Sequence, residues 1–63
     1  MKDCMGALIA VGSRVVTYTH RHWARYGRVI SIDTALSEAV VRIEHDQAEV
    51  TIHRSNLEVK EAA

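Results

Sequence analysis

The segment from His20 to Arg28 holds the residues with the most evident chemistry in the chain. It gathers three arginines, two histidines and two aromatic side chains within nine residues. Arginine offers paired donors to phosphate, and Trp and Tyr offer faces on which an unpaired base can stack. Histidine adds a donor whose charge changes near neutral pH. The sequence therefore predicts a nucleic-acid or partner interface made of Arg21, Trp23, Arg25, Tyr26 and Arg28, with Arg14 and His22 at its margin.

A purely structural role for the same segment is the alternative. The chain contains no Phe, so Trp23 and Tyr26 could cover the end of the hydrophobic core while the arginines stay in water. The sequence alone favours neither interpretation.

The other reactive side chains do not form a recognisable catalytic or metal-binding set. Zinc needs three or four converging ligands, whereas the four histidines are scattered and Cys4 is the only cysteine. No serine lies in a Gly-x-Ser-x-Gly turn, and a core this small has little room for a buried cleft. We therefore expect no metal, no cofactor and no enzyme activity, unless an oligomer creates a pocket.

Length and composition describe a small folded domain. Sixty-three residues are enough for one domain, and 48% apolar with 25% charged residues is typical of globular proteins. The apolar run from Met5 to Val11 is much shorter than the roughly 20 residues of a membrane span. A single cysteine excludes an internal disulfide. These features predict a cytoplasmic protein with a small core of Val, Ile, Leu and Ala and no membrane partner.

The net charge is zero, but the two halves of the chain differ in sign. Residues 1–32 carry five basic and one acidic side chain, and residues 33–63 carry three basic and seven acidic ones. Such a dipole suits a nucleic-acid surface, docking to another protein, or weak association with a second copy.

Alternation of apolar and polar residues with period two predicts an all-β fold, because no segment keeps the spacing of an amphipathic helix. The expected strands are Arg14–Thr19, Arg28–Asp33, Glu38–His45, Ala48–His53 and Leu57–Lys60. A long loop should cover residues 20–26, and one helical turn should precede the last strand. The predicted inward side chains are Val15, Val29, Ile32, Val41, Ile43, Val50, Ile52 and Leu57. This outline is that of a five-stranded SH3-like barrel over residues 12–60, with residues 61–63 as a C-terminal tail.

Residues 1–11 are either an N-terminal tail or an additional edge strand. An apolar run left loose in water favours aggregation, so we expect this segment to dock on the barrel or to pair with another copy.

Between Val15 and Val41 the chain resembles a KOW motif, the signature of SH3-like barrels in NusG-type elongation factors and some ribosomal proteins. The matching residues are Gly12 and Val15, Gly27, Val29 and Ile32, and Val40 with Val41. The resemblance implies a barrel that binds nucleic acid or a transcription or translation machine. One difference is that the bulky segment His20–Tyr26 stands where KOW domains carry a glycine-containing loop.

A weaker similarity is to plasmid-borne type II dihydrofolate reductases, which are small oligomeric SH3-like barrels. They share a Gly-x-Arg-Val start with residues 12–15, a Trp late in the first loop, and a Val-x-Ile strand with residues 50–52. The Gln and Tyr of that family's pore correspond here to Thr51 and His53, and its pore lysine corresponds to Thr17. The family's substrate-contacting groups are thus absent.

The sequence as a whole predicts a non-enzymatic binding module for nucleic acid or a nucleic-acid machine. The alternatives are a protein-binding adaptor or inhibitor and, third, an oligomeric reductase.

Overall fold

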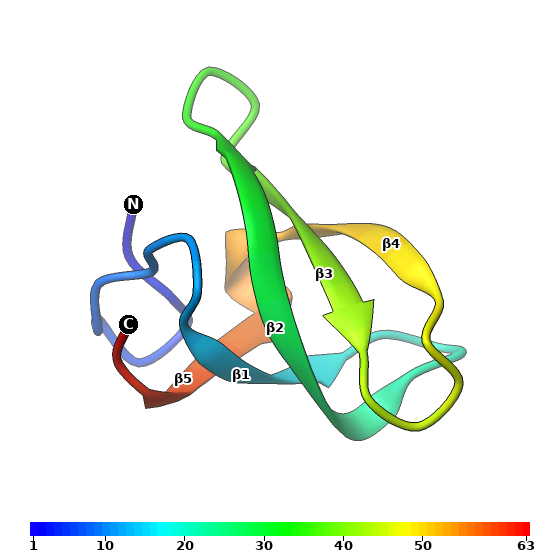
Figure 1. Ribbon diagram of the computed structural model, residues 1–63. Coiled ribbons are helices and arrows are strands. Elements are labelled where there is room, and N and C mark those ends of the chain that lie inside the picture. Colours follow the sequence, from blue (N-terminus) through cyan, green and yellow to red (C-terminus); the bar gives the residue numbers. More distant parts are fainter.

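A computed structural model describes all residues, 1–63, as five strands and one short 3-10 turn (Figure 1). The elements are β1 (Arg14–Tyr18), β2 (Trp23–Asp33), β3 (Glu38–Ile43), β4 (Glu49–His53), the turn η1 (Arg54–Asn56) and β5 (Leu57–Glu61). The strands form one antiparallel sheet in the order β4-β3-β2-β1-β5. The predicted all-β class with five strands is confirmed. The sheet is open, because β4 and β5 are its edges and do not pair with each other.

Strand β2 is longer than the sequence pattern predicts. It begins at Trp23 and not at Arg28, so the loop between β1 and β2 covers only residues 19–22. Residues 25 and 26 continue the ladder opposite Thr17 and Val16. The buried Thr17 hydroxyl also donates to the carbonyl oxygen of His22 at 2.6 Å, which fixes the start of the strand. Residues 23–26 of the segment expected to be a loop therefore belong to β2.

All five strands contribute to one hydrophobic core, because the sheet curls around it (Figure 1). Its buried members are Ile9, Val15, Val29, Ala39, Val41, Ile43, Ile52 and Leu57. Six of the eight predicted core residues are fully buried, whereas Ile32 and Val50 pack at its margin. Ile9 is the member outside the sheet, and it comes from the N-terminal segment.

Gly27 lies where β2 crosses the middle of the sheet, opposite Val15 and Ile43. A Cβ atom at this position would lie 2.5 Å from Cγ1 of Val41 and 2.8 Å from the carbonyl oxygen of Arg42. A larger residue would force the backbones of β2 and β3 apart, so this close approach accounts for the glycine.

The N-terminal segment folds back on the sheet as an irregular loop. It contains one isolated β-bridge, between Lys2 and Leu8, and forms no strand. Asp3 is buried, and its carboxylate accepts backbone N–H groups of Met5 at 2.9 Å, Ala7 at 2.7 Å and Val59 at 2.6 Å. Burial alone would raise the pKa of Asp3, but these hydrogen bonds outweigh it and lower the pKa. The segment is thus held by a polar bond network as well as by Ile9.

Candidate nucleic-acid interface

A β-bulge at Ala24 divides the predicted interface between the two faces of the sheet. Thr17 lies opposite Arg25, and the next residue of β1, Tyr18, lies opposite Trp23, which leaves Ala24 as the extra residue. Its φ of 56° is the left-handed conformation common at such irregularities. Neighbouring residues of a strand point to opposite faces. Trp23 therefore shares the face of Tyr18, while Arg25 shares the inward side of Thr17 at the end of the sheet.

The outer face of the sheet, opposite the core, carries three aromatic side chains that we call the aromatic platform: Tyr18, Trp23 and Tyr26. The Tyr18 and Trp23 rings meet edge to face, with centroids 5.3 Å apart and planes at 70°. Trp23 remains 68% exposed and Tyr26 41% exposed. Val16 is buried between the in-register Tyr26 and Glu58, although it is not part of the main core. The platform is therefore a small packed layer with an open outer surface.

Tyr18 is held in place by Glu58 of β5. Its hydroxyl donates to the Glu58 carboxylate at 2.8 Å, and this hydrogen bond, helped by burial, raises the pKa of Tyr18. Because this hydrogen bond holds the hydroxyl end of Tyr18, the Tyr18 ring has a fixed position. It can therefore support the Trp23 ring, which it meets edge to face.

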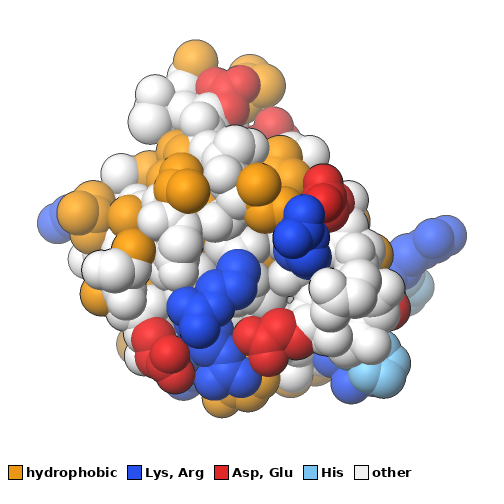
Figure 2. Space-filling view, in the orientation of Figure 1, with side chains coloured by type: hydrophobic (Ala, Val, Ile, Leu, Met, Phe, Trp, Pro, Cys, Tyr) orange, Lys and Arg blue, Asp and Glu red, His pale blue; other side chains and the backbone are white.

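Beside the platform, a row of charged residues crosses all five strands on the outer face. The strand registers place Glu61 opposite Arg14, Arg14 opposite Arg28, Arg28 opposite Arg42, and Arg42 opposite Glu49. Three adjacent arginines are thus flanked by a glutamate at each end of the row, and Figure 2 shows basic and acidic side chains close together on the face that it views. Like charges on adjacent strands destabilise a sheet unless other groups compensate them.

Carboxylates provide that compensation for Arg14. Its guanidinium binds both oxygens of Glu44, at 2.9 and 3.1 Å, and one oxygen of Glu61 at 3.5 Å. It also lies 4.0 Å above the centroid of the Tyr26 ring. The Arg14 hydrogen bond lowers the pKa of Glu44, so this carboxylate stays ionised. Arg14 is thus part of a closed ion-pair network.

The other two arginines of the row are also accompanied by carboxylates. Arg42 binds Glu49 at 2.6 Å. Arg28 donates to the carbonyl oxygen of Gly12 at 3.1 Å and lies 3.9 Å from Glu61, the longest ion pair in the molecule. Arg28 is consequently the member of the row with the loosest carboxylate contact.

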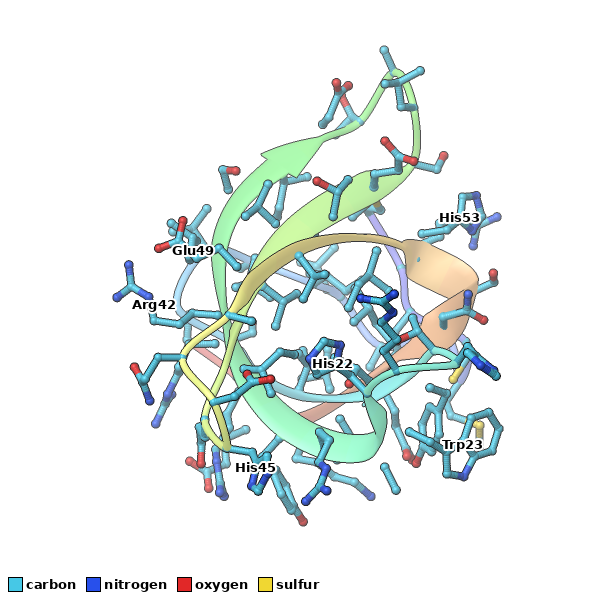
Figure 3. All side chains as sticks on the ribbon, turned by 90° about the vertical axis from the view of Figure 1, so that its right-hand side faces the viewer. His22, Trp23, Arg42, His45, Glu49 and His53 are labelled. Atoms are coloured by element: carbon cyan, nitrogen blue, oxygen red, sulfur yellow. The ribbon has the colours of Figure 1, made fainter.

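Arg21 and Arg25 differ from the row, because neither has a carboxylate within ion-pair distance and both are exposed. Between them, His22 turns inward, and its Nε2 lies 3.1 Å from Asp46 in the β3–β4 hairpin. The Ala48 N–H and this histidine together lower the pKa of Asp46. Figure 3 shows His22 toward the middle of this side of the molecule and Trp23 projecting at its margin.

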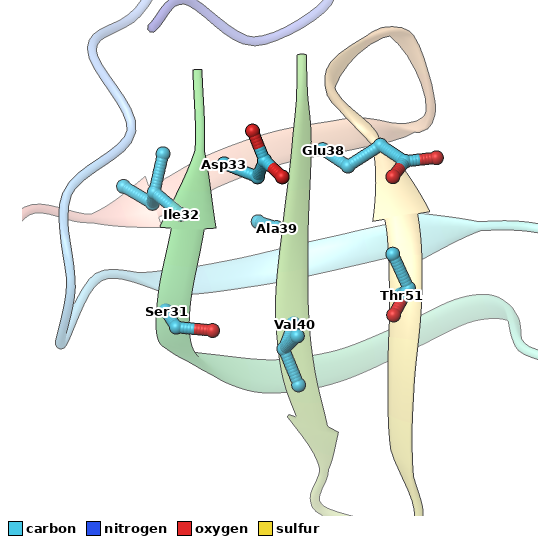
Figure 4. A pocket seen from close by; sticks show the side chains of 7 residues that line it. All are labelled: Ser31, Ile32, Asp33, Glu38, Ala39, Val40 and Thr51. Carbon is cyan, nitrogen blue, oxygen red and sulfur yellow. The ribbon is translucent and has the colours of Figure 1, made fainter. Parts of the chain in front are cut away.

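A shallow groove lies further along β2, β3 and β4, next to the β2–β3 hairpin (Figure 4). It is lined by Ser31, Ile32, Asp33, Glu38, Ala39, Val40 and Thr51. Its two carboxylates, Asp33 and Glu38, make this end of the outer face one that would repel phosphate.

The predicted site residues thus separate into three groups. Trp23 and Tyr26 share the platform, Arg14 and Arg28 belong to the ion-pair row beside it, and Arg21 and Arg25 remain free at the end of the sheet. His22 is occupied by Asp46. Tyr18, Glu44 and Glu61 are neighbours of these residues that the sequence pattern does not indicate. The opposite charges of the two halves of the chain were the available signal.

No three side chains of the types His, Cys, Asp and Glu come close enough together to hold a metal ion. Cys4 is exposed, and Thr17, which corresponds to the pore lysine of the reductases, is buried with its hydroxyl bonded to backbone carbonyls. The structure contains no helix that is long and apolar enough to cross a membrane. No known protein family matches the chain, and no curated protein and no solved structure shows significant similarity to it.

Proposed function

We propose that the protein is a small non-enzymatic binding module that engages a short single strand of nucleic acid, alone or within a nucleic-acid machine. The observation that carries the proposal is Trp23, a large apolar ring that is 68% exposed on an ordered strand and supported by Tyr18. Base stacking on such a ring contributes about 1 to 3 kcal/mol. A pre-positioned ring loses little conformational freedom when a base stacks on it.

The phosphate contacts in this proposal come from Arg21 and Arg25, because they have no internal carboxylate to displace. Arg28 can add a third contact, since its ion pair with Glu61 is long at 3.9 Å. Arg14 and Arg42 are already neutralised. Few free cations and a neutral molecule imply modest affinity, a short site and a steep loss of binding with salt.

The KOW resemblance supports the same class of partner by analogy. Gly27, Val29 and Val41, which are among the residues that carry this resemblance, lie at the centre of the sheet. A fold by itself does not define a function, so the proposal depends on Trp23 and its neighbours.

The experiment uses the single tryptophan as its own probe. Titration with short single-stranded DNA and RNA at low salt should quench Trp23 fluorescence, and anisotropy of a labelled oligonucleotide should report binding independently. Trp23→Ala should weaken binding about 5- to 150-fold. Leu36→Ala is the matched control, because Leu36 is 62% exposed on the distant β2–β3 hairpin and should have no effect.

The arginines provide a second comparison. Arg25→Ala should weaken binding and flatten the logarithmic salt dependence by about 0.7 for each lost phosphate contact. Arg42→Ala removes an arginine that Glu49 already pairs, and it should change neither quantity measurably. If the wild-type chain binds no nucleic acid at low salt, the proposal fails.

A protein-binding adaptor is the second candidate, and the ion-pair row favours it. Arginines paired with glutamates beside exposed Trp and Tyr resemble the polar and aromatic composition of protein interfaces more than a phosphate track. In that case Trp23→Ala would abolish binding to a protein partner, and nuclease treatment of the lysate would leave the captured complex intact.

A further inference from the structure

The two edges of the sheet are treated differently by the rest of the chain. Along β5, the N–H of Cys4 donates to the Leu57 carbonyl at 3.0 Å, and the Val59 N–H donates to Asp3 at 2.6 Å. Along β4, no backbone group of residues 49–53 has a hydrogen bond to anything except β3. An uncovered edge presents a row of unpaired N–H and C=O groups.

The register shows which residues direct these groups outward. The N–H of Ile43 bonds to the carbonyl of Ala48 at 2.8 Å, and hydrogen-bonded and non-hydrogen-bonded pairs alternate along an antiparallel ladder. Counting from that bond, every second residue of β4 turns its N–H and C=O away from β3. These residues are Glu49, Thr51 and His53.

We infer that β4 is a self-association edge, on which two copies of this chain pair antiparallel about a two-fold axis through Thr51. Thr51 then faces Thr51 of the second copy, and Glu49 faces His53 of the second copy. Each of these pairs can exchange two backbone hydrogen bonds. A two-fold arrangement repeats the Glu–His contact on both sides of the axis.

The side chains on this edge complement each other under that symmetry. His53 accepts the N–H of Ser55 through Nδ1 at 3.2 Å, so its neutral ring carries the proton on Nε2. That donor is free to meet the carboxylate of Glu49 from the second copy. Figure 3 shows Glu49 and His53 at the two ends of β4.

The charged row continues across the proposed junction. In the joined sheet the residues Arg28, Arg42 and Glu49 of one copy are followed by His53, Glu38 and Asp33 of the second. The basic end of one outer face thereby meets the acidic groove of the other. On the inner side, the partly exposed Val50 comes to lie opposite Ile52 of the second copy, whose side chain is buried in its own core. The complementary charges on the outer side therefore commit the edge to a second copy of this chain.

Sedimentation velocity of the full chain over a wide concentration range tests the inference. The wild type should show a reversible dimer. His53→Glu places two carboxylates opposite each other twice, and Glu49→Lys places a cation opposite His53 twice. Each variant alone should dimerise at least about tenfold more weakly, while circular dichroism shows the fold unchanged.

A mixture of the two variants is the decisive measurement. In the heterodimer the introduced lysine faces the introduced glutamate, and native Glu49 faces native His53. Native mass spectrometry should therefore detect mainly the heterodimer in a 1:1 mixture.

Leu8→Ala is the control at a competing surface, because Leu8 is 65% exposed on the N-terminal segment beside Met5 and Val11. It should leave the dimer intact. A wild type that stays monomeric at about 1 mM would overturn the inference. Unchanged dimerisation affinity in both charge variants would overturn it as well. Because the tested residues lie on β4 and not beside Trp23, either result is independent of nucleic-acid binding.

Discussion

The two edges of the sheet are built from chemically similar residues but are stabilised in opposite ways. At β5 a carboxylate, Asp3, is buried and accepts three backbone N–H groups, while Ile9 enters the core beside it. At β4 a carboxylate, Glu49, stays in water and binds only the exposed Arg42. The chain therefore covers one edge with its own N-terminus and leaves the other available.

This difference implies that the covered edge at β5 contributes to folding stability and that the open edge at β4 is available for association. Buried, hydrogen-bonded groups are costly to remove, whereas exposed ion pairs contribute little to folding. A small domain has a free energy of unfolding of only about 3 to 9 kcal/mol. Substitutions of buried groups at the covered edge should then threaten folding, and substitutions of the outward-facing residues at the open edge should mainly affect association.

The largest loss of folding stability is expected when an apolar side chain is removed from the core. Each edge of the sheet offers one such residue, Ile52 on β4 and Ile9 on the N-terminal segment that covers β5. Ile52→Ala on β4 and Ile9→Ala on the N-terminal segment should each cost about 2 to 5 kcal/mol, because both are nearly completely buried. Urea denaturation followed by circular dichroism measures the loss. Leu8→Ala, at an exposed neighbouring position, should cost less than about 0.5 kcal/mol. Equal losses for residues 8 and 9 would contradict the described docking of the N-terminus.

The next largest effect concerns the buried carboxylate. Asp3→Asn replaces a group that accepts three N–H donors by an amide with one acceptor oxygen, so at least one donor is left unsatisfied. We expect a loss of about 1 to 3 kcal/mol at pH 7 in the same denaturation measurement. Glu38→Gln, a change of the same kind at a residue that forms no ion pair, should be nearly neutral.

The pH dependence of stability separates the two edges further. The pKa of Asp3 is lower in the folded protein than in the unfolded chain, as are those of Glu44 and Asp46. Groups of this kind stabilise the fold above their unfolded pKa, near 4, and the contribution disappears as the pH falls through their folded pKa values. The thermal midpoint of the wild type should therefore decrease when the pH is lowered below about 4. The fall should be shallower in Asp3→Asn, and an unchanged profile would contradict the assigned bonds.

Much of the fold could be predicted from alternation alone. Val41, Ile43 and Ile52 point inward because residues of one strand alternate between two faces, and this rule needs no three-dimensional information. The start of β2 was mispredicted, since Arg, His and Trp in residues 21–23 resemble a polar loop in sequence. The strand extends there because Thr17 satisfies the backbone at the turn, which is a contact that no local pattern encodes.

The candidate site was less predictable than the fold. The sequence identified Trp23, Arg21 and Arg25, which remain exposed, but it gave no sign that Arg28, or Arg14 at the margin, is paired with carboxylates. Their pairing with Glu44 and Glu61 depends on the register of β1 with β2 and β5, and a shift of one residue would move every side chain to the other face. The bulge at Ala24, which separates Trp23 from Arg25, likewise has no glycine or proline to mark it.

The smallest expected effect is at the open edge. Glu49→Gln removes the ion pair with Arg42, in which both side chains are about half exposed, and water replaces most of the lost interaction. The free energy of unfolding should change by less than about 0.5 kcal/mol when measured at a protein concentration low enough to keep the chain monomeric.

The same substitution also weakens the contact with His53 of a second copy. Raising the protein concentration should therefore reveal a difference in stability from the wild type, and dilution should remove it. Asp3→Asn should show its full loss at every concentration, because its bonds lie within one chain. A concentration-independent loss above 1 kcal/mol for Glu49→Gln would mean that Glu49 supports the fold as Asp3 does, and the distinction between a closed and an open edge would then be wrong.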